Sequence, residues 1–250
     1  MEKLPGGIMV NLSLGEDYSS LIDRLSDMVR ERFDRSQSSQ TQQVLEFASH
    51  YYAAAPIQEL QRKRIEDLYG LTVGLWDFVR SMPSNQPRIR VFNPKYEDHG
   101  WQSTHTVVEV LAPDCAFLVD TVMMDVVQRG VSIHSVMNSV FETERDEKGE
   151  LTNLSFDLKG KGKKEALIHL EIDRQPDEAL VGDIGQMLRD TLRELEAAVT
   201  DFPTMQARSS EIEKDLKVQA NSEGQASLEE VRKFLRWLVQ NHFTLLAMKE

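Results

Sequence analysis

Hydrophobic residues recur at helical spacing along the first third of the chain. Through residues 19–83 the apolar positions fall three or four apart, which places them on one face of a helix. The pattern predicts three helices, and the third is expected to run unbroken from Pro56 to about Met82. Residues 1–18 show no period and are predicted to be a flexible arm. Residues 19–83 are therefore interpreted as a helical leader.

After Pro87 the period of the apolar residues changes to two, which is typical of strands. The predicted strands are residues 88–92, 104–111 and 131–144, followed by alternating segments around Leu154 and around Ile168. A slip in the apolar phase near Ser135 predicts a bulge in the third strand. We interpret the last three strands as a meander with one apolar face.

Two helices are predicted among these strands. The first begins after Asp114, a good N-cap, and ends before Gly130, which suits a C′ position. It links two strands as a right-handed βαβ unit whose strands are parallel. The second begins at Pro176-Asp177 and is expected to end near Pro203. Because each helix has one apolar stripe, residues 88–202 are predicted to form an α+β sandwich: an antiparallel-rich sheet with two helices on one face.

Residues 204–250 are predicted to be a helical linker followed by the first strand of another module. Ser227 and Glu230 have the spacing of a capping box at the start of a helix. An apolar segment at 243–248 reads as a strand with nothing after it to pair with. We therefore expect a longer polypeptide that continues beyond Glu250.

Charge and cysteine content exclude several classes of protein. The chain has 29 Lys and Arg against 41 Asp and Glu, a formal net charge of −12. This balance argues against nucleic-acid binding and against a polybasic membrane surface. The single cysteine excludes an internal disulfide. No signal peptide or apolar run of bilayer length is evident, so we expect a cytoplasmic protein without a membrane partner.

The candidates for chemistry are few. No dinucleotide fingerprint or P-loop is present. The glycine and lysine run from Gly160 to Lys164 could cradle an anion, but a solvated turn is favoured because no helix follows it. His105, His134 and His169 lie on predicted strands and could converge as ligands or bases. We favour half-exposed strand histidines, and we predict no metal site.

Cys115 lies in the predicted first turn of a helix, where the helix dipole could lower the thiol pKa and make it reactive. A partly buried thiol without chemistry is favoured. Neighbouring acids are interpreted as solvent-facing groups or caps; these are the pairs Glu142 with Glu144 and Glu229 with Glu230. No catalytic residue is therefore predicted.

Several segments together resemble the N-terminal segment of the large bacterial NAD-specific glutamate dehydrogenases. They are the segments Tyr51-Tyr52, Pro56-Ile-Gln-Glu-Leu60, Asp67-Leu-Tyr-Gly70, His105-Thr-Val-Val-Glu-Val110, Phe117-Leu-Val-Asp-Thr-Val122, Arg129-Gly-Val-Ser-Ile-His134, Phe234-Leu-Arg-Trp-Leu238 and Asn241-His-Phe-Thr-Leu245. The resemblance implies an ACT-like domain, related to the ferredoxin-like fold. It also implies a catalytic domain far downstream that oxidises L-glutamate to 2-oxoglutarate with NAD, and no cofactor in this chain.

Two departures from the ordinary ACT pattern stand out. Phe117 falls where ACT modules carry a glycine beside a bound amino acid, so its ring would obstruct a ligand there. The usual last strand is not evident, and residues 88–92 are expected to take its place in the sheet.

The resemblance implies a non-catalytic regulatory and oligomerisation domain, with the catalytic domain of the same chain and further copies as partners. An alternative is an amino-acid sensor at the turn of Asp114, Cys115, Ala116 and Phe117. An independent enzyme that uses Cys115 or the strand histidines is the least favoured reading.

Overall fold

The computed structural model describes residues 16–32, 38–82, 86–219, 225–242 and 246. Most of the predicted arm, and most of the predicted strand at 243–248, lie outside these residues. Two compact units are formed by residues 1–189 and 190–250. The sheet and the helical segments packed on it belong to the first unit.

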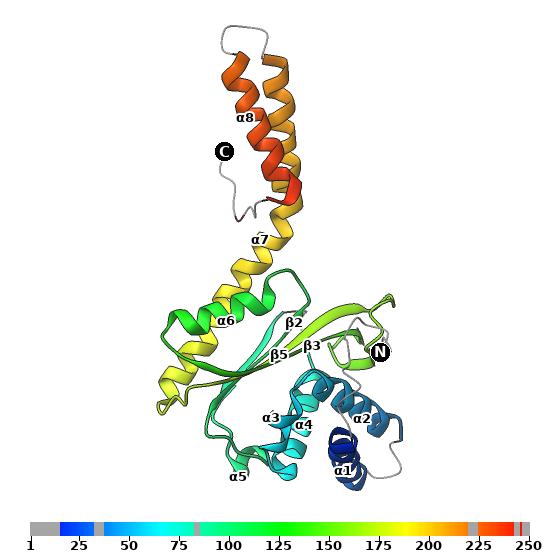
Figure 1. Ribbon diagram of the computed structural model, residues 1–250. Helices are drawn as coiled ribbons and strands as arrows, with labels where there is room; N and C mark the ends of the chain where they lie inside the picture. The colour runs from blue at the N-terminus through cyan, green and yellow to red at the C-terminus, as the bar shows by residue number, and fades with distance from the viewer. Residues whose placement is uncertain (1–15, 33–37, 83–85, 220–224, 243–245, 247–250) are drawn as a thin grey trace. The chain divides into compact units, whose positions relative to one another are not determined.

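The first unit is built on a five-stranded sheet (Figure 1). Its strands are β1 (Arg88–Phe92), β2 (Thr106–Pro113), β3 (Ile133–Arg145), β4 (Leu151–Ser155) and β5 (Lys163–Ile172). Their order is β1-β2-β5-β3-β4, and every neighbouring pair is antiparallel. Since β5 lies antiparallel between β2 and β3, those two strands are parallel to each other, as predicted for the βαβ unit. β1 pairs with the outer side of β2. Residues 88–92 were expected to take the place of the usual last strand of an ACT-like sheet.

The predicted meander is wrong. β4 and β5 lie on opposite sides of β3 rather than beside each other. The physical reason is burial: β5 is buried on both faces from Glu165 to Ile172, which suits an interior strand, whereas the half-exposed β4 occupies an edge. The predicted irregularity in β3 is confirmed by a register shift between Ile133 and Ser135.

Two helices cover one face of the sheet, as predicted (Figure 1). They are α6 (Leu118–Gln128) and the first part of α7 (Glu178–Gln219). Gly130 follows α6 with a φ of 75°, the left-handed conformation expected at C′. Asp177 caps α7, because its Oδ1 accepts a hydrogen bond of 2.8 Å from the amide of Ala179. The predicted α+β class and the ACT-like arrangement of sheet and helices are confirmed.

The predicted end of the long helix at Pro203 is wrong, because α7 continues through this proline to Gln219. A proline inside a helix costs about 3 kcal/mol, so tertiary contacts must hold the continuation. Glu213 of α7 provides such contacts by accepting from Arg232 at 2.9 Å and from Arg236 at 2.8 Å, both on α8 (Gln225–Trp237). The predicted cap at Ser227 is also wrong, since α8 begins two residues earlier.

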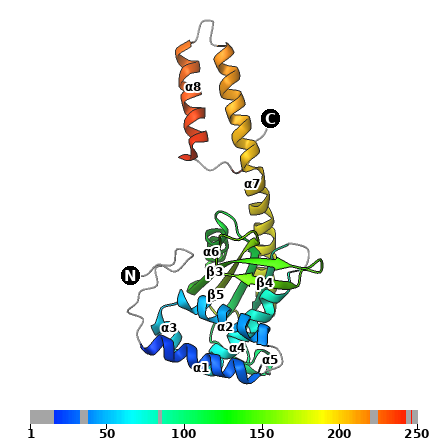
Figure 2. The same ribbon diagram turned by 90° about the vertical axis from the view of Figure 1, so that its right-hand side faces the viewer.

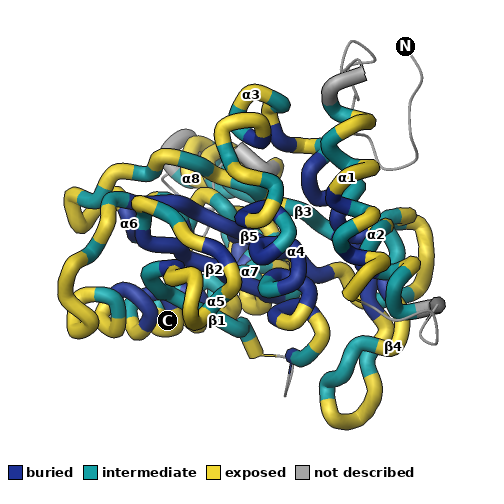
Figure 3. Tube along the Cα trace, turned by 90° about the horizontal axis from the view of Figure 1, so that it is seen from below, coloured by how far each residue is buried: buried dark blue, intermediate teal, exposed yellow. Residues whose placement is uncertain are grey.

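The helical leader covers the other face of the sheet (Figures 1 and 2). It comprises α1 (Glu16–Arg32), α2 (Ser38–Ala53), α3 (Ile57–Gln61) and α4 (Ile65–Arg80). Its core residues Phe47, Leu75 and Trp76 belong to one buried cluster with Val107 and Leu167 of the sheet. The sheet is thus enclosed by helices on both sides, and its central strands are buried in Figure 3.

The leader contains one more break than predicted. The expected helix from Pro56 to Met82 is divided into α3 and α4 by the turn of Arg62, Lys63 and Arg64, where Arg64 is extended at a ψ of 149°. Lys63 in this turn forms an ion pair with Glu171 of β5. The helical spacing of apolar residues in the sequence gives no information about such an ion pair with a distant strand.

Two arginines from the sheet fix the end of α4. Arg88 donates to the carbonyl of Phe78 at 2.9 Å, and Arg145 donates to the carbonyl of Val79 at 2.8 Å. The last carbonyls of a helix lack partners within the helix, and cations are favoured there by the helix dipole. These contacts join the leader and the sheet into one structure.

Candidate functional site

The turn between β2 and α6 holds the residues predicted from the sequence to bind an effector. Asp114 and Ala116 are exposed, and the amide of Asp114 donates to the carbonyl of Lys164 at 2.9 Å. The predicted N-cap role of Asp114 is wrong, because α6 begins at Leu118 and Phe117 is its N-cap. Cys115 therefore lies three residues before the helix rather than in its predicted first turn.

Phe117 occupies a left-handed backbone conformation, with φ 66° and ψ 4°. It is the only residue other than glycine with positive φ in the described part of the chain. This is the conformation that glycine adopts without steric cost, at the position where the resemblance leads us to expect glycine. The side chain is 53% exposed, so the ring lies at the surface.

A row of charged side chains crosses the sheet on the face that the leader covers. Arg90, Glu109 and His169 are direct partners across β1, β2 and β5. Arg90 forms an ion pair with Glu109, and His169 Nδ1 lies 3.4 Å from Glu109 Oε1. Glu171, two residues along β5, lies 4.0 Å from His169 Nε2. Glu109 and His169 are almost completely buried, so buried charges of opposite sign compensate one another beneath the leader.

Burial and charge compete in setting the pKa values of this row. Burial lowers the pKa of His169, but Glu109 and Glu171 outweigh it and raise the pKa above the usual value of 6.5. Burial raises the pKa of Glu171, but His169 and Lys63 outweigh it and lower the pKa to about 2. The pKa of Glu109 is likewise lowered by His169 and Arg90 against the effect of burial. In all three groups the ion-pair partners therefore outweigh burial and favour the charged form.

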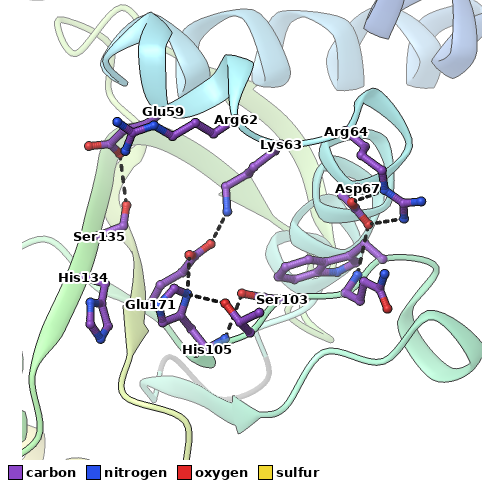
Figure 4. A pocket seen from close by; sticks show the side chains of 13 residues that line it. Glu59, Arg62, Lys63, Arg64, Asp67, Ser103, His105, His134, Ser135 and Glu171 are labelled. Atoms are coloured by element: carbon purple, nitrogen blue, oxygen red, sulfur yellow. Dashed lines mark hydrogen bonds and ion pairs between the residues drawn. The ribbon is translucent and has the colours of Figure 1, made fainter.

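One end of this row opens into a cavity of about 520 Å³ between the leader and the sheet (Figure 4). Its leader side consists of residues from α3, the following turn and α4. Its sheet side consists of residues before β2 and at the ends of β3 and β5. The lining residues are Glu59, Arg62, Lys63, Arg64, Asp67, Trp101, Gln102, Ser103, Thr104, His105, His134, Ser135 and Glu171.

Most charges in this cavity are paired. Lys63 and His105 both contact Glu171, the latter through Nδ1 at 3.3 Å. Arg64 Nε donates to Asp67 Oδ2 at 2.8 Å, and Asp67 Oδ1 accepts from the amide of Gln102 at 3.2 Å. The pKa of Asp67 is lowered chiefly by its hydrogen bond to Arg64. These contacts hold positively and negatively charged side chains at defined places in the cavity wall.

Two of the three histidines considered from the sequence converge. The rings of His105 and His134 lie 4.4 Å apart between centroids, and both residues line the cavity. His134 Nε2 lies 2.7 Å from Asp173, whose pKa is lowered to about 2 by hydrogen bonds to Ser132 and His134. His169, by contrast, is only 1% exposed, so its predicted half-exposed position is wrong. The reason is its place in the buried part of the central strand β5.

A second cavity of about 390 Å³ lies at the other end of the charged row. Arg90 lines it together with α4 and α5 (Tyr96–His99), and Trp101 lines both cavities. The turn of residues 114–117 lines neither of them. Sequence reasoning missed these two cavities. The available signals were the basic run at residues 62–64 and the charged residues at otherwise apolar strand positions.

Metal binding and membrane insertion find no support in the described ranges. No group of three or more His, Cys, Asp or Glu residues there is placed to hold a metal ion. No described helix is both long enough and apolar enough to traverse a bilayer.

The fold and its charged cavity define an ACT-like α+β domain with an added helical leader. The family model described as "Glutamate dehydrogenase, ACT1 domain" matches residues 47–188. The chain therefore belongs to the glutamate dehydrogenase ACT1 family. The match runs from the last part of α2 to the first part of α7 and thus includes both sides of the cavity.

Relatives with assigned names agree with this family. The chain is 34% identical over 245 residues to the NAD-specific glutamate dehydrogenase of Halomonas elongata, covering 97% of this chain and 15% of the relative. It is 40% identical over 215 residues to that of Pseudomonas aeruginosa, covering 83% of this chain and 13% of the relative. The corresponding protein of Mycobacterium tuberculosis is 25% identical over 145 residues, which cover 56% of this chain and 9% of the relative. The chain thus spans about 15% or less of the length of these relatives.

Proposed function

We propose that this chain is a non-catalytic regulatory and assembly segment of a large NAD-specific glutamate dehydrogenase. The whole enzyme would oxidise L-glutamate to 2-oxoglutarate with NAD in the cytoplasm. The glutamate and NAD sites would lie on the part of the relatives' length that this chain does not cover. Its partners would be the catalytic domain of the same chain and further copies in a homo-oligomer.

The observation that carries this proposal is the enclosure of the sheet between two helical layers. The buried carboxylate of Glu109 pairs with the buried His169 and with the half-buried Arg90. Buried groups that are held by one another are poorly placed to exchange protons with a substrate. We further propose that residues 88–202 act as the ACT-like domain and that 204–250 link it to the next module.

Deletion from the whole enzyme tests this role. We expect an enzyme that lacks residues 1–250 to retain glutamate-dependent NAD reduction and to change its oligomeric state or its response to effectors. Activity assays with analytical ultracentrifugation measure both properties. Turnover of glutamate and NAD by the isolated 250-residue chain would refute the proposal. So would a deleted enzyme with unchanged assembly and unchanged regulation.

A second candidate function is amino-acid sensing at the turn of Asp114, Cys115, Ala116 and Phe117. The left-handed backbone of Phe117 favours it, because that conformation marks the position at which a ligand would approach the backbone. Replacing Phe117 with glycine would open this approach. We expect calorimetric titration with amino acids to give tighter binding for Phe117→Gly than for the wild type. Equal affinities would remove this candidate.

A further inference from the structure

Hydrogen-bond donors meet in the smaller cavity, which has a volume of about 390 Å³. Trp101 is only 3% exposed, yet its indole N–H donates a hydrogen bond to no residue in the described part of the chain. Its Nε1 lies 4.0 Å from the point that a Cβ on Gly74 would occupy, and Arg90 Nη2 lies 3.9 Å from that point. All three residues line the cavity. A buried donor without an acceptor and a guanidinium therefore face the same space beside Gly74.

Arg90 is held in place and still has donors to offer. Its Nε donates to Glu109 Oε2 at 2.7 Å, and its Nη2 donates to the carbonyl of Gly74 at 3.3 Å. The guanidinium carbon also lies 4.7 Å from the ring centroid of Phe92. Among the described residues, none accepts a hydrogen bond from Nη1. A guanidinium fixed in this way suits a ligand acceptor such as a ring carbonyl.

Aromatic rings form much of the wall of this cavity. The ring of His99 stacks on Phe92 with 4.7 Å between centroids, and Trp101 meets Phe92 edge to face at 6.2 Å. Tyr69 of α4 lines the same cavity. A flat heteroaromatic ring would bury its faces against such a wall, because bases stack well on aromatic side chains.

Two charged residues that line this cavity form no ion pair with any described residue. They are Arg32, the last residue of α1, and Asp98 of α5, and both are exposed. A phosphate group suits the guanidinium of Arg32, and the carboxylate of Asp98 suits the N–H groups of a base. Asp77 also lines the cavity, so one phosphate group is favoured over a more highly charged polyphosphate.

From these contacts we propose that the smaller cavity binds a 6-oxopurine nucleotide with one phosphate group. Trp101 and Arg90 would donate to the carbonyl side of the base, and Asp98 would accept from its N–H groups. Arg32 would hold the phosphate. Adenine carries an amino group in place of the carbonyl, so it would leave the two protein donors unpaired. The cavity volume is within the usual range for small-molecule sites.

Calorimetric titration of the 250-residue chain with GMP and IMP tests this proposal. We expect both nucleotides to bind. AMP, guanosine and inorganic phosphate should each bind at least about tenfold more weakly than GMP. AMP lacks the base carbonyl, guanosine lacks the phosphate, and inorganic phosphate lacks the base, so the three probes separate the contributions of the parts.

Variants test the position of the ligand. Trp101→Phe keeps an aromatic ring but removes the N–H, Gly74→Leu fills the space that the donors face, and Arg32→Gln removes a charge. Each is expected to weaken GMP binding by about tenfold or more. Arg24→Gln changes an exposed residue of the same helix outside the cavity, and Gly182→Leu adds a side chain where a Cβ has no neighbour within 4 Å. Both matched controls should bind GMP as the wild type does, and circular dichroism checks that every variant is folded.

Several outcomes would overturn the inference. They are the absence of saturable binding by GMP and IMP, binding of AMP or inorganic phosphate as tight as that of GMP, and unchanged GMP affinity in folded Trp101→Phe and Arg32→Gln variants. Loss of binding in Arg62→Gln with retention in Arg32→Gln would assign the nucleotide to the larger cavity instead. The inference goes beyond the proposed assembly role, and none of these outcomes decides that role, which is tested separately by deleting residues 1–250 from the whole enzyme.

Discussion

Glu109 of β2 and His169 of β5 face each other as direct cross-strand partners, with 3.4 Å between Oε1 and Nδ1, in the interior of the protein. Strand positions of this kind are normally apolar when both faces of a sheet are covered. The leader buries the pair, and Arg90 and Glu171 extend it on either side. The leader therefore rests on a charged layer at the centre of the sheet, surrounded by apolar contacts.

Removing the charge of Glu109 should destabilise the fold, because it leaves Arg90 and His169 without their shared carboxylate. We expect Glu109→Gln to lower the free energy of unfolding by about 3 kcal/mol. The exposed pair of Arg30 and Asp27 provides a control, and Asp27→Asn should cost no more than about 1 kcal/mol. Urea unfolding followed by circular dichroism measures both. Equal effects in the two variants would contradict the assigned importance of the buried pair.

The stability of the fold should depend on the protonation of His169. Its folded pKa is raised above 6.5, so its stabilisation is fully present below pH 6.5 and is lost as the pH rises through the folded pKa. We expect the thermal midpoint of the wild type to fall as the pH rises above 6.5 through the folded pKa. His169→Gln should have a lower midpoint and a flatter pH dependence above pH 6.5. An identical pH profile in the two proteins would refute a charged His169.

Glu171 should limit stability at acid pH. Its folded pKa of about 2 lies below the usual 4.5, so its stabilisation is present above pH 4.5 and is lost as the pH falls toward 2. Glu171→Gln should therefore reduce the stability at neutral pH and weaken the acid dependence. Urea unfolding at several pH values between about 3 and about 7 measures this. A variant that keeps the full acid dependence would show that other carboxylates are responsible.

Two glycines on α4 should respond oppositely to the same substitution. A Cβ on Gly70 would lie 2.6 Å from the carbonyl oxygen of Gly100, a backbone atom that cannot move away cheaply. A Cβ on Gly74 would have no neighbour closer than 3.9 Å. We expect Gly70→Ala to destabilise by about 1–3 kcal/mol and Gly74→Ala to stabilise by up to about 1 kcal/mol. Denaturant unfolding of the two variants tests this, and equal effects would contradict the close approach at Gly70.

The left-handed conformation of Phe117 predicts a preference for glycine at this position. Phe117→Gly should be about 1 kcal/mol more stable than Phe117→Ala, because alanine retains the Cβ that disfavours positive φ. Comparing the two variants removes the contribution of the ring, which both lose. Chemical unfolding supplies the two free energies. If alanine were the more stable variant, the turn would have to adopt another conformation.

Local sequence patterns predicted most of the strands and helices. The segment Arg88–Phe92 was predicted with its observed bounds, and Gly130 occupies the predicted position after α6. The errors occur where a distant partner decides the local structure. Lys63 interrupts a helical stripe to reach Glu171, and α7 passes through Pro203 with contacts from α8 to support it. Periodicity reports which face is apolar, and it does not report such partners.

The candidate site was less accessible to sequence reasoning. The turn at Phe117 was identified from the resemblance, and its unusual backbone is present in the structure. The cavity was missed because its walls come from segments about forty to one hundred residues apart, such as Glu59, His105 and Glu171. Their separate surroundings in the sequence give no reason to group them.

The sequence by itself determined the α+β class and the helical leader, because apolar spacing and turn residues act locally. Its dispersed motifs also suggested the protein family to which the chain belongs. Only the tertiary structure decided that the leader closes the second face of the sheet and buries Glu109 and His169. Only it placed Glu59, His105 and Glu171 around one cavity. The physical reason is that burial, ion pairing and cavity shape depend on which surfaces meet, and this is a property of the folded chain as a whole.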